Sequence, residues 1–340
     1  MPSAAEPVVT TFVGRSMGSR LRLLVAAPAP PSAASPASAA STVPDPDLPA
    51  GWDRVLAAIW VAVRAEFAAT DLALSKYRVT SGLSGLNSLV GSGVDSFAAG
   101  RRLATALELG AVAREATGGR FEIAVLAALD GLGEAAVATP PDAIADDVAA
   151  AIGAEPADIA VDVPAAAVDL GGIGKGLALR WAAERIVPHL PDGAGALIDA
   201  GGDLVTVGIA PDGGWRIGVE DPLVPGEHVA VAAVRSGAIA TSSVRVRHWR
   251  DADGRVQHHL IDPRSSLPAR TDLVAVTVAD PDPAWAEIWT KSLFLAGRSG
   301  IGPEARERDI AAWWVDSTGK VGLTPAAREM SAWVDERRIG

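Results

Sequence analysis

Four glycines and one lysine are concentrated in a short stretch near the middle of the 340-residue chain, Asp169-Leu-Gly-Gly-Ile-Gly-Lys-Gly176. Glycine lets the backbone turn tightly and approach a ligand, and a helix that follows directs free N–H groups toward an anion. The stretch therefore predicts a phosphate-binding turn. Its spacing matches neither G-x-x-x-x-G-K-[ST] nor G-x-G-x-x-G, so neither a P-loop nor a Rossmann turn is indicated. A plain strand-to-helix turn with a surface lysine also fits these residues.

Further stretches combine small, polar and chemically reactive residues. They are Asp199-Ala-Gly-Gly-Asp203, Ala240-Thr-Ser-Ser243 and His258-His-Leu-Ile-Asp-Pro-Arg264. His259 has a proton affinity near neutral pH, so beside a diphosphate it is a candidate general base for a hydroxyl or a water. A strand-end histidine that pairs with Asp262 is the alternative. No serine lies in a G-x-S-x-G turn, so a Ser-His-Asp hydrolase is not indicated.

The composition narrows the classes of partner. The 30 basic and 41 acidic residues give a net charge of −11 without a long basic run, so nucleic acid and anionic membranes are not expected to bind. The chain has no cysteine, which excludes disulfides, thiolate zinc sites and a cysteine nucleophile. The first residues lack the basic and apolar regions of a signal peptide, so we expect a cytoplasmic protein.

Strands and helices must position these residues. Turn residues and apolar clusters predict strands at 8–12, 20–25, 167–170, 194–199, 204–208, 215–219 and 229–234, and a closing hairpin at 310–323. Helical spacing of apolar residues predicts helices at 52–76, 101–117, 142–152, 177–187 and 326–338. Charged side chains within 52–76 make a buried helix the better interpretation than a membrane span. Residues 26–50, rich in Ala, Pro and Ser, predict a disordered insertion.

With Ser16-Met-Gly-Ser19 and Ser75-Lys-Tyr-Arg78 upstream, this ordered set of motifs resembles the FAD:protein FMN transferases, the ApbE-like family. The resemblance runs from about Val13 to Gly322. It implies an α+β fold, a single domain of mixed β-sheets with flanking helices. We expect this domain over residues 8–323, interrupted by the insertion at 26–50, and a C-terminal helix or tail over 324–340.

The resemblance also implies which residues bind FAD. It places Met17 near the flavin, packs the ring of Tyr77 on the isoalloxazine, and gives Glu122 the place of the family's usual Asp. Without it, Tyr77 is an ordinary core or rim residue, and Asp169 and Asp203 are turn-stabilising residues. Ser81 and Asn87 are expected in turns or helix caps. The implied FAD-binding set is Met17, Tyr77, Arg120, Phe121, Glu122, Asp169, Lys175 and Ile261, with His259 as the base.

A magnesium site is the third implication of the resemblance. The backbone carbonyl of Gly172 would bind Mg²⁺ together with Glu287 and Thr290, which lie on a helix at 284–297. Lys291 stands where the family usually has Thr, and an ammonium group among the ligands would repel the metal. Glu287 and Lys291 are also four residues apart, the spacing of an ion pair on a helix surface. Lys291 further fits the role of a point charge on a phosphate.

The function implied is transfer of FMN from FAD to a Thr or Ser hydroxyl of an acceptor protein, with release of AMP. Two alternatives stay open at this point. One is a Mg²⁺-dependent FAD pyrophosphatase, in which water replaces the acceptor hydroxyl. The other is a non-catalytic FAD-binding protein with a degenerate metal site, because of Lys291.

Overall fold

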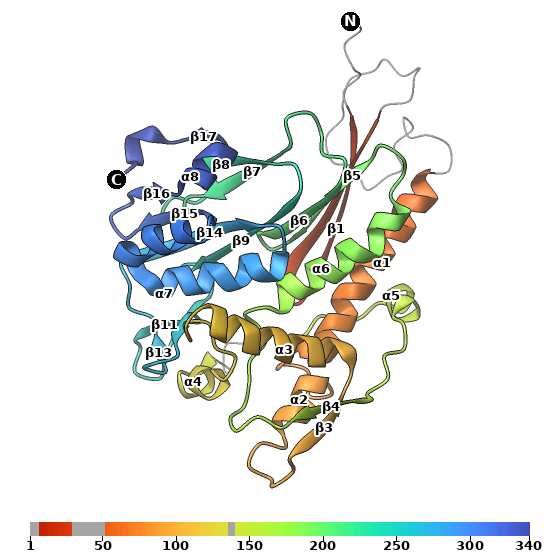
Figure 1. Cartoon of the computed structure of the whole chain (residues 1–340). Coiled ribbons are helices and arrows are strands. Elements are labelled where there is room, and N and C mark those ends of the chain that lie inside the picture. Colours follow the sequence, from red (N-terminus) through yellow and green to blue (C-terminus); the bar gives the residue numbers. More distant parts are fainter. Residues whose placement is uncertain (1–6, 29–51, 135–139) are drawn as a thin grey trace, which may run out of the picture.

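The fold is built around an eight-stranded sheet ordered β1-β2-β5-β6-β9-β14-β15-β16 (Figure 1). A computed structural model describes residues 7–28, 52–134 and 140–340 of the chain. Every neighbouring pair of strands in the large sheet is antiparallel. The strands are β1 Val8–Ser16, β2 Ser19–Ala27, β5 Gly195–Ala200, β6 Asp203–Gly208, β9 Gly237–Ser243, β14 Leu273–Asp280, β15 Ala311–Asp316 and β16 Val321–Leu323.

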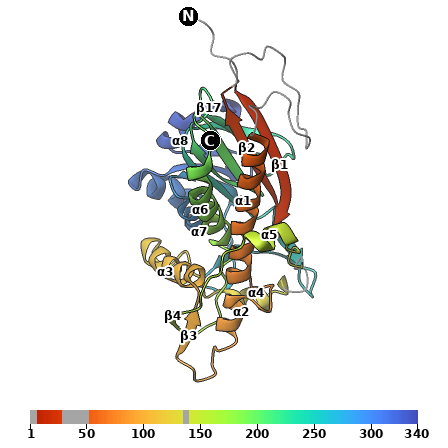
Figure 2. The same cartoon turned by 90° about the vertical axis from the view of Figure 1, so that its right-hand side faces the viewer.

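Alternating side chains give the large sheet two buried faces. Leu21, Leu23 and Val25 of β2 pack against helices α1 (Trp52–Leu74) and α6 (Gly174–Ile186), which run side by side (Figures 1 and 2). Helix α7 (Pro283–Glu307) lies against β9 and β14. The opposite face packs on a three-stranded sheet ordered β17-β8-β7. Its strands are β7 Trp215–Glu220, β8 His228–Val234 and β17 Ser331–Val334.

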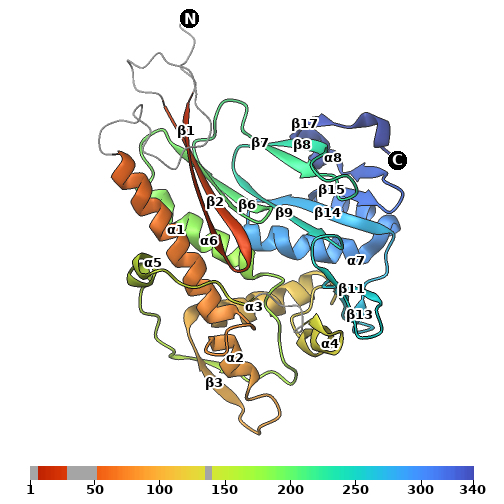
Figure 3. The ribbon, with the colours of Figure 1, turned by 180° about the vertical axis from the view of Figure 1, so that it is seen from behind.

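Short elements surround the ends of the central helices. The helices are α2 Gly82–Asn87, α3 Arg101–Ala116, α4 Leu126–Gly131, α5 Asp146–Ala151 and α8 Pro325–Met330. Three antiparallel pairs complete the fold: β3 Ser96–Ala99 with β4 Ile159–Asp162, β10 His248–Arg250 with β11 Val256–His258, and β12 Ile261–Asp262 with β13 Leu267–Pro268. Leu129 of α4 packs with Trp249 and Ile261, so α4 lies beside these small hairpins (Figure 3). None of the described helices is both long and apolar enough to cross a membrane.

The predicted α+β class with mixed sheets and flanking helices is confirmed, but the predicted C-terminal helix over 326–338 is wrong. The chain there forms α8, then β17, then a 3₁₀ turn at Glu336–Arg338. β17 pairs with β8 and buries Val334, so the tail completes the three-stranded sheet. The segment after residue 324 therefore contacts the rest of the described fold through β17.

Three other boundaries differ from the sequence prediction. Strand β2 continues through the buried residues Ala26 and Ala27, which were expected to begin the insertion, and residues 29–50 of that segment lie outside those described. The helix expected at 142–152 is reduced to α5. The strand expected at 167–170 is absent, because the side chain of Asn87 takes up both backbone polar groups of Val168 at 2.9 Å. Asn87 therefore holds the backbone of this segment by hydrogen bonds. Ser81 is a helix cap, as predicted, and it caps the N-terminus of α2.

Gly176 allows the start of α6 to contact the start of α7. A Cβ atom at this position would lie 2.6 Å from the carbonyl oxygen of Pro283 and from the Cα of Ala284. Both are backbone atoms, which cannot rotate away. The closeness of two helix ends, rather than ligand binding, thus explains the last glycine of the central stretch.

We expect Gly176→Ala to lower the free energy of unfolding by about 2 kcal/mol, because the clash outweighs the better helix propensity of alanine. Urea denaturation measures this change. Gly131→Ala at the end of α4 is the matched control, since no atom lies within 4 Å of its added Cβ. Equal stability of the two variants would contradict the assignment of Gly176 to close packing.

Candidate functional site

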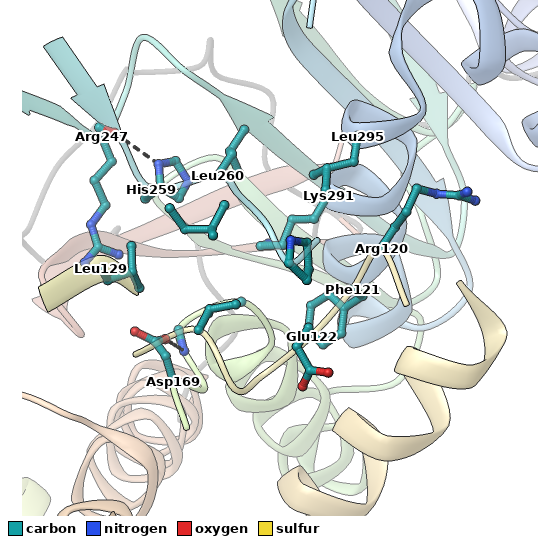
Figure 4. A pocket seen from close by; sticks show the side chains of 15 residues that line it. Arg120, Phe121, Glu122, Leu129, Asp169, Arg247, His259, Leu260, Lys291 and Leu295 are labelled. Atoms are coloured by element: carbon teal, nitrogen blue, oxygen red, sulfur yellow. Dashed lines mark hydrogen bonds between the residues drawn. The ribbon is translucent and has the colours of Figure 1, made fainter. Parts of the chain in front are cut away.

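A pocket opens where the glycine-rich loop meets α7, α4 and the segment that follows β10 and β11 (Figure 4). Lys291 projects from α7, and His259 lies on the same wall, while Asp169 and Glu122 lie on the opposite side. Six of the residues that the sequence predicts to act on the ligand line this pocket. They are Arg120, Phe121, Glu122, Asp169, Ile261 and His259, joined by the predicted metal-binding Gly172.

Backbone contacts hold the glycine-rich loop in place. The N–H of Asp169 donates to the carbonyl of Ile123 at 2.7 Å, and the N–H of Gly171 donates to the Asp169 carboxylate at 2.6 Å. The second contact is the turn-stabilising arrangement that the sequence left open for Asp169. A Cβ at Gly172 would lie 3.2 Å from the Phe121 ring and 3.3 Å from Cε of Lys291. Glycine at 172 thus lets Lys291 lie directly across the loop.

His259 is neutral, with one ring nitrogen free to accept a proton. Its Nδ1 lies 3.1 Å from the backbone carbonyl oxygen of Arg247, which only accepts hydrogen bonds, so Nδ1 carries the proton. Burial, with the nearby charges of Arg247 and Lys291, lowers the pKa of His259 to about 3. The alternative pairing with Asp262 is wrong, because Asp262 binds its neighbour Arg264 at 2.7 Å. Nε2 is therefore the ring nitrogen that can accept a proton, and its proton affinity is lower than the near-neutral value expected from the sequence.

Acid should destabilise the protein through His259. Its pKa is about 6.5 in the unfolded chain and about 3 in the folded one. Between these values the unfolded state binds more protons, so stability falls as the pH falls through that window. From pH 7 to pH 5 we expect the loss of about 2 kcal/mol in the free energy of unfolding, measured by urea denaturation. In His259→Asn, the part of the pH dependence that comes from His259 should be absent. If the free energy of unfolding of that variant fell with pH as in the wild type, His259 would not be its source.

Four charged side chains of alternating sign form an ion chain: Arg247, Glu134, Lys76 and Asp169. Its two ends, Arg247 and Asp169, line the pocket. Glu134 pairs with both Arg247 and Lys76, and Lys76 also pairs with Asp169. Glu134 is almost fully buried, at 2% exposure. Because the carbonyl of Arg247 binds His259, this ion chain links His259 to the glycine-rich loop. No local motif connects Arg247, Glu134 and Lys76, so the sequence predicts no role for them.

The predicted metal site is filled by an ion pair. Lys291 Nζ lies 3.4 Å from Oε1 of Glu287, the helix-surface pair that the sequence allowed, and 3.2 Å from the Glu287 carbonyl. The other carboxylate oxygen accepts the N–H of Gly176 at 2.9 Å. Thr290 is fully buried, and its hydroxyl contacts Ser242 at 2.7 Å and the Glu287 carbonyl at 2.8 Å. The predicted ligands are therefore already engaged with protein groups.

These residues do not fit Mg²⁺, which needs several free oxygen ligands in octahedral geometry. Within residues 7–28, 52–134 and 140–340, no group of three or more His, Asp or Glu side chains is arranged to hold a metal ion. The side chain of Lys291, the ion-pair partner of Glu287, lies beside Gly172. The metal predicted from the resemblance is thus not supported by the geometry.

Three predicted ligand-binding residues lie outside the pocket lining. Met17 packs beside Gly174 at the start of α6, with its backbone in the left-handed region at φ 49°. The hydroxyl of Tyr77 is bound to Arg247 and Glu134, so the tyrosine stabilises the ion chain.

Lys175 pairs with Asp203, away from the pocket. Burial by itself would lower the pKa of Lys175, but Asp203, Glu287 and Asp199 raise it overall.

The charged ends of two lining residues also point away from the pocket. Arg120 pairs with Glu304 of α7, and Glu122 binds Arg114 of α3 at 2.7 Å (Figure 4). The other two cations of the pocket lining are Lys291 and Arg247, which pair with Glu287 and Glu134 and share the pocket with the neutral ring of His259. An anionic ligand with a hydroxyl-bearing partner suits this arrangement, because the cations attract the anion and the ring accepts a proton.

The antiparallel sheet with helices on one face defines an α+β protein. Its pocket has a glycine-rich loop that faces a neutral histidine and a lysine, an arrangement that suits an anionic ligand. A sequence model of the ApbE family matches residues 39–314. The chain belongs to the ApbE family.

Relatives with assigned names share parts of the chain. A Klebsiella pneumoniae protein named FAD:protein FMN transferase is 30% identical over 168 residues, which cover 48% of this chain and 50% of that protein. A Treponema pallidum protein of the same name is 28% identical over 253 residues, 67% of this chain and 68% of that one. The chain thus spans about half to two thirds of these relatives. The crystal structure of the ApbE protein from Thermotoga maritima covers 96% of this chain and 100% of its own, with a TM-score of 0.72 at 19% identity, and shows the same fold.

Proposed function

We propose that this protein transfers FMN from FAD to a Thr or Ser hydroxyl of an acceptor protein and releases AMP. The observation that carries the proposal is that His259 and Lys291 line the same pocket, with Lys291 lying beside Gly172 of the glycine-rich loop. Family membership and the names of the relatives support the same activity.

The proposed step forms one bond and breaks one. The acceptor hydroxyl oxygen bonds to the phosphorus of the FMN half of FAD, and the bond from that phosphorus to the bridging oxygen breaks. The bridging oxygen leaves as part of AMP, and the hydroxyl proton passes to Nε2 of His259. The cations of Lys291 and Arg247 in the pocket lining would attract the diphosphate. The ion chain would hold His259 close to the glycine-rich loop, because Arg247 belongs to that chain and its carbonyl binds His259.

The pocket offers room for part of a FAD molecule. The space between its lining residues measures about 600 Å³, open solvent included, and pockets for small molecules measure about 300–1,000 Å³. We place the diphosphate beside Lys291 and His259. Phe121, Ile261 and Asp169 line the same pocket and remain proposed FAD contacts.

The ion pair between Lys291 and Glu287 favours a second candidate, a FAD-binding protein without transfer activity. Such a protein would keep the pocket and lack the metal that the family resemblance implies. A Mg²⁺-dependent FAD pyrophosphatase is less consistent with the structure, because Glu287 and Thr290 are both engaged with protein groups.

Incubation of the purified protein with FAD, with and without a library of peptides that contain Thr or Ser, separates these functions. Chromatography measures AMP, and flavin fluorescence after denaturation detects covalently labelled peptide. Labelled peptide together with AMP would support the transferase. AMP with free FMN, independent of peptide, would identify a pyrophosphatase, and bound FAD without AMP would identify a flavin-binding protein.

A further inference from the structure

We propose that the ammonium group of Lys291 takes the place of a divalent metal in this protein and binds the diphosphate of FAD directly. The site then works without Mg²⁺. This inference rests on FAD as the ligand of the proposed function, but it concerns binding as well as transfer, so it can be tested separately.

The position of Lys291 is the first observation. Its side chain crosses the glycine-rich loop at Gly172, in van der Waals contact with the place that a Cβ would occupy. Its side chain is 17% exposed, and it lines the same pocket as His259. A point charge placed there lies in the lining of the pocket to which the proposed function assigns the phosphate groups of FAD.

The charge balance around Glu287 is the second observation. Glu287 is the partner of Lys291, but one of its oxygens also accepts the N–H of Gly176 at the positive end of α6. The charge of Lys175 also acts on it, because Glu287 helps to raise the Lys175 pKa. The carboxylate is therefore shared among several positive groups. Lys291 keeps attraction for a second anion, which the diphosphate supplies.

Access for a metal is the third observation. A divalent ion near the Gly172 carbonyl would have to displace Lys291 from Glu287 and break the Thr290–Ser242 contact of 2.7 Å. Displacing Lys291 would leave its ammonium group close to the metal, and like charges repel. The same residues that prevent metal binding thus place a cation in its position.

The direct test compares the affinity of the protein for FAD with its affinity for riboflavin, which lacks the diphosphate, in excess EDTA. Flavin fluorescence measures both affinities. We expect EDTA and added Mg²⁺ to change the FAD affinity of the wild type by less than twofold. We expect Lys291→Met to weaken FAD binding about tenfold and to leave riboflavin binding unchanged. A requirement for Mg²⁺ in wild-type FAD binding, or equal losses for the two flavins, would overturn the inference.

AMP release provides the second measurement. In EDTA, the wild type should retain its rate, and Lys291→Met should lose about 100-fold, since removal of one charge-stabilising group typically costs that much. Lys320→Met is the matched control, because Lys320 is exposed and far from this pocket, and its rate should not change. Thermal melting of Lys291→Met and Lys291→Arg verifies that both variants fold. An EDTA-sensitive wild type that Mg²⁺ restores would refute the inference.

The two proposals fail in different ways. If no AMP appears under any condition while Lys291→Met selectively weakens FAD binding, the transferase proposal is wrong and the role of Lys291 stands. If AMP release proceeds only with Mg²⁺, the transferase stands and the role of Lys291 is wrong.

Discussion

His259→Asn should lower the rate of AMP release from FAD about 1,000-fold, within the range typical of a lost general base. Asparagine can still donate a hydrogen bond to the Arg247 carbonyl, so the loop around residue 259 keeps its anchor. What disappears is the free ring nitrogen that accepts the hydroxyl proton. FAD affinity should change little, because the cations of Lys291 and Arg247 remain in the pocket.

Steady-state kinetics at saturating FAD would measure this loss, and fluorescence titration would confirm that FAD still binds. His258→Asn is the matched control, because His258 precedes the base in the chain but does not line the pocket. It should keep its rate within about threefold. Equal losses in the two variants would show that the histidine pair acts through structure alone and would remove His259 from the chemistry.

Glu134→Ala should lower the free energy of unfolding by about 3 kcal/mol, because it leaves a buried charge with fewer partners. Glu134 is the central anion of the ion chain, bound to Lys76, Arg247 and the hydroxyl of Tyr77. Lys76 keeps Asp169 as a partner, which holds the loss near the lower end of the range for buried pairs. Urea denaturation near neutral pH measures the change.

Glu336→Ala is the control for this prediction. Glu336 also pairs with an arginine, Arg328, but its side chain is 65% exposed. Exposed pairs contribute about 0–1 kcal/mol, so this variant should stay close to the wild type. Similar losses at positions 134 and 336 would contradict the view that burial makes the ion chain important.

Much of the scaffold follows from local sequence patterns. Apolar residues at helical spacing predict the long helices α1 and α3, and alternating apolar residues between turn signals predict β5 to β8 and the β15–β16 hairpin. These patterns are reliable because each such element buries one face of its own side chains. The same patterns do not predict β14, an interior strand of the sheet, because its nearly continuous burial removes the alternation that marks a half-exposed strand.

The C-terminal segment shows where local patterns fail. Residues 326–338 look helical, but Val334 is buried through pairing of β17 with β8, almost 100 residues earlier in the chain. Similarly, Asn87 looks like a cap but binds Val168. In both cases a partner distant in sequence determines the backbone conformation, and propensity is too weak to oppose it.

The motifs of the sequence and the family they resemble predict the α+β class, the glycine-rich turn before α6, and His259 and Lys291 as residues that could act on a diphosphate. The tertiary structure alone decided which of these residues share a pocket. In the folded chain, one ion chain joins Arg247, Glu134, Lys76 and Asp169. Tyr77 and Lys175 bind other protein groups instead of lining the pocket. Lys291 lies beside Gly172. The physical reason is that a buried charge is costly unless it is paired, and its partner is whichever opposite charge the fold brings close. The separation of two residues along the chain does not show whether the fold brings them together.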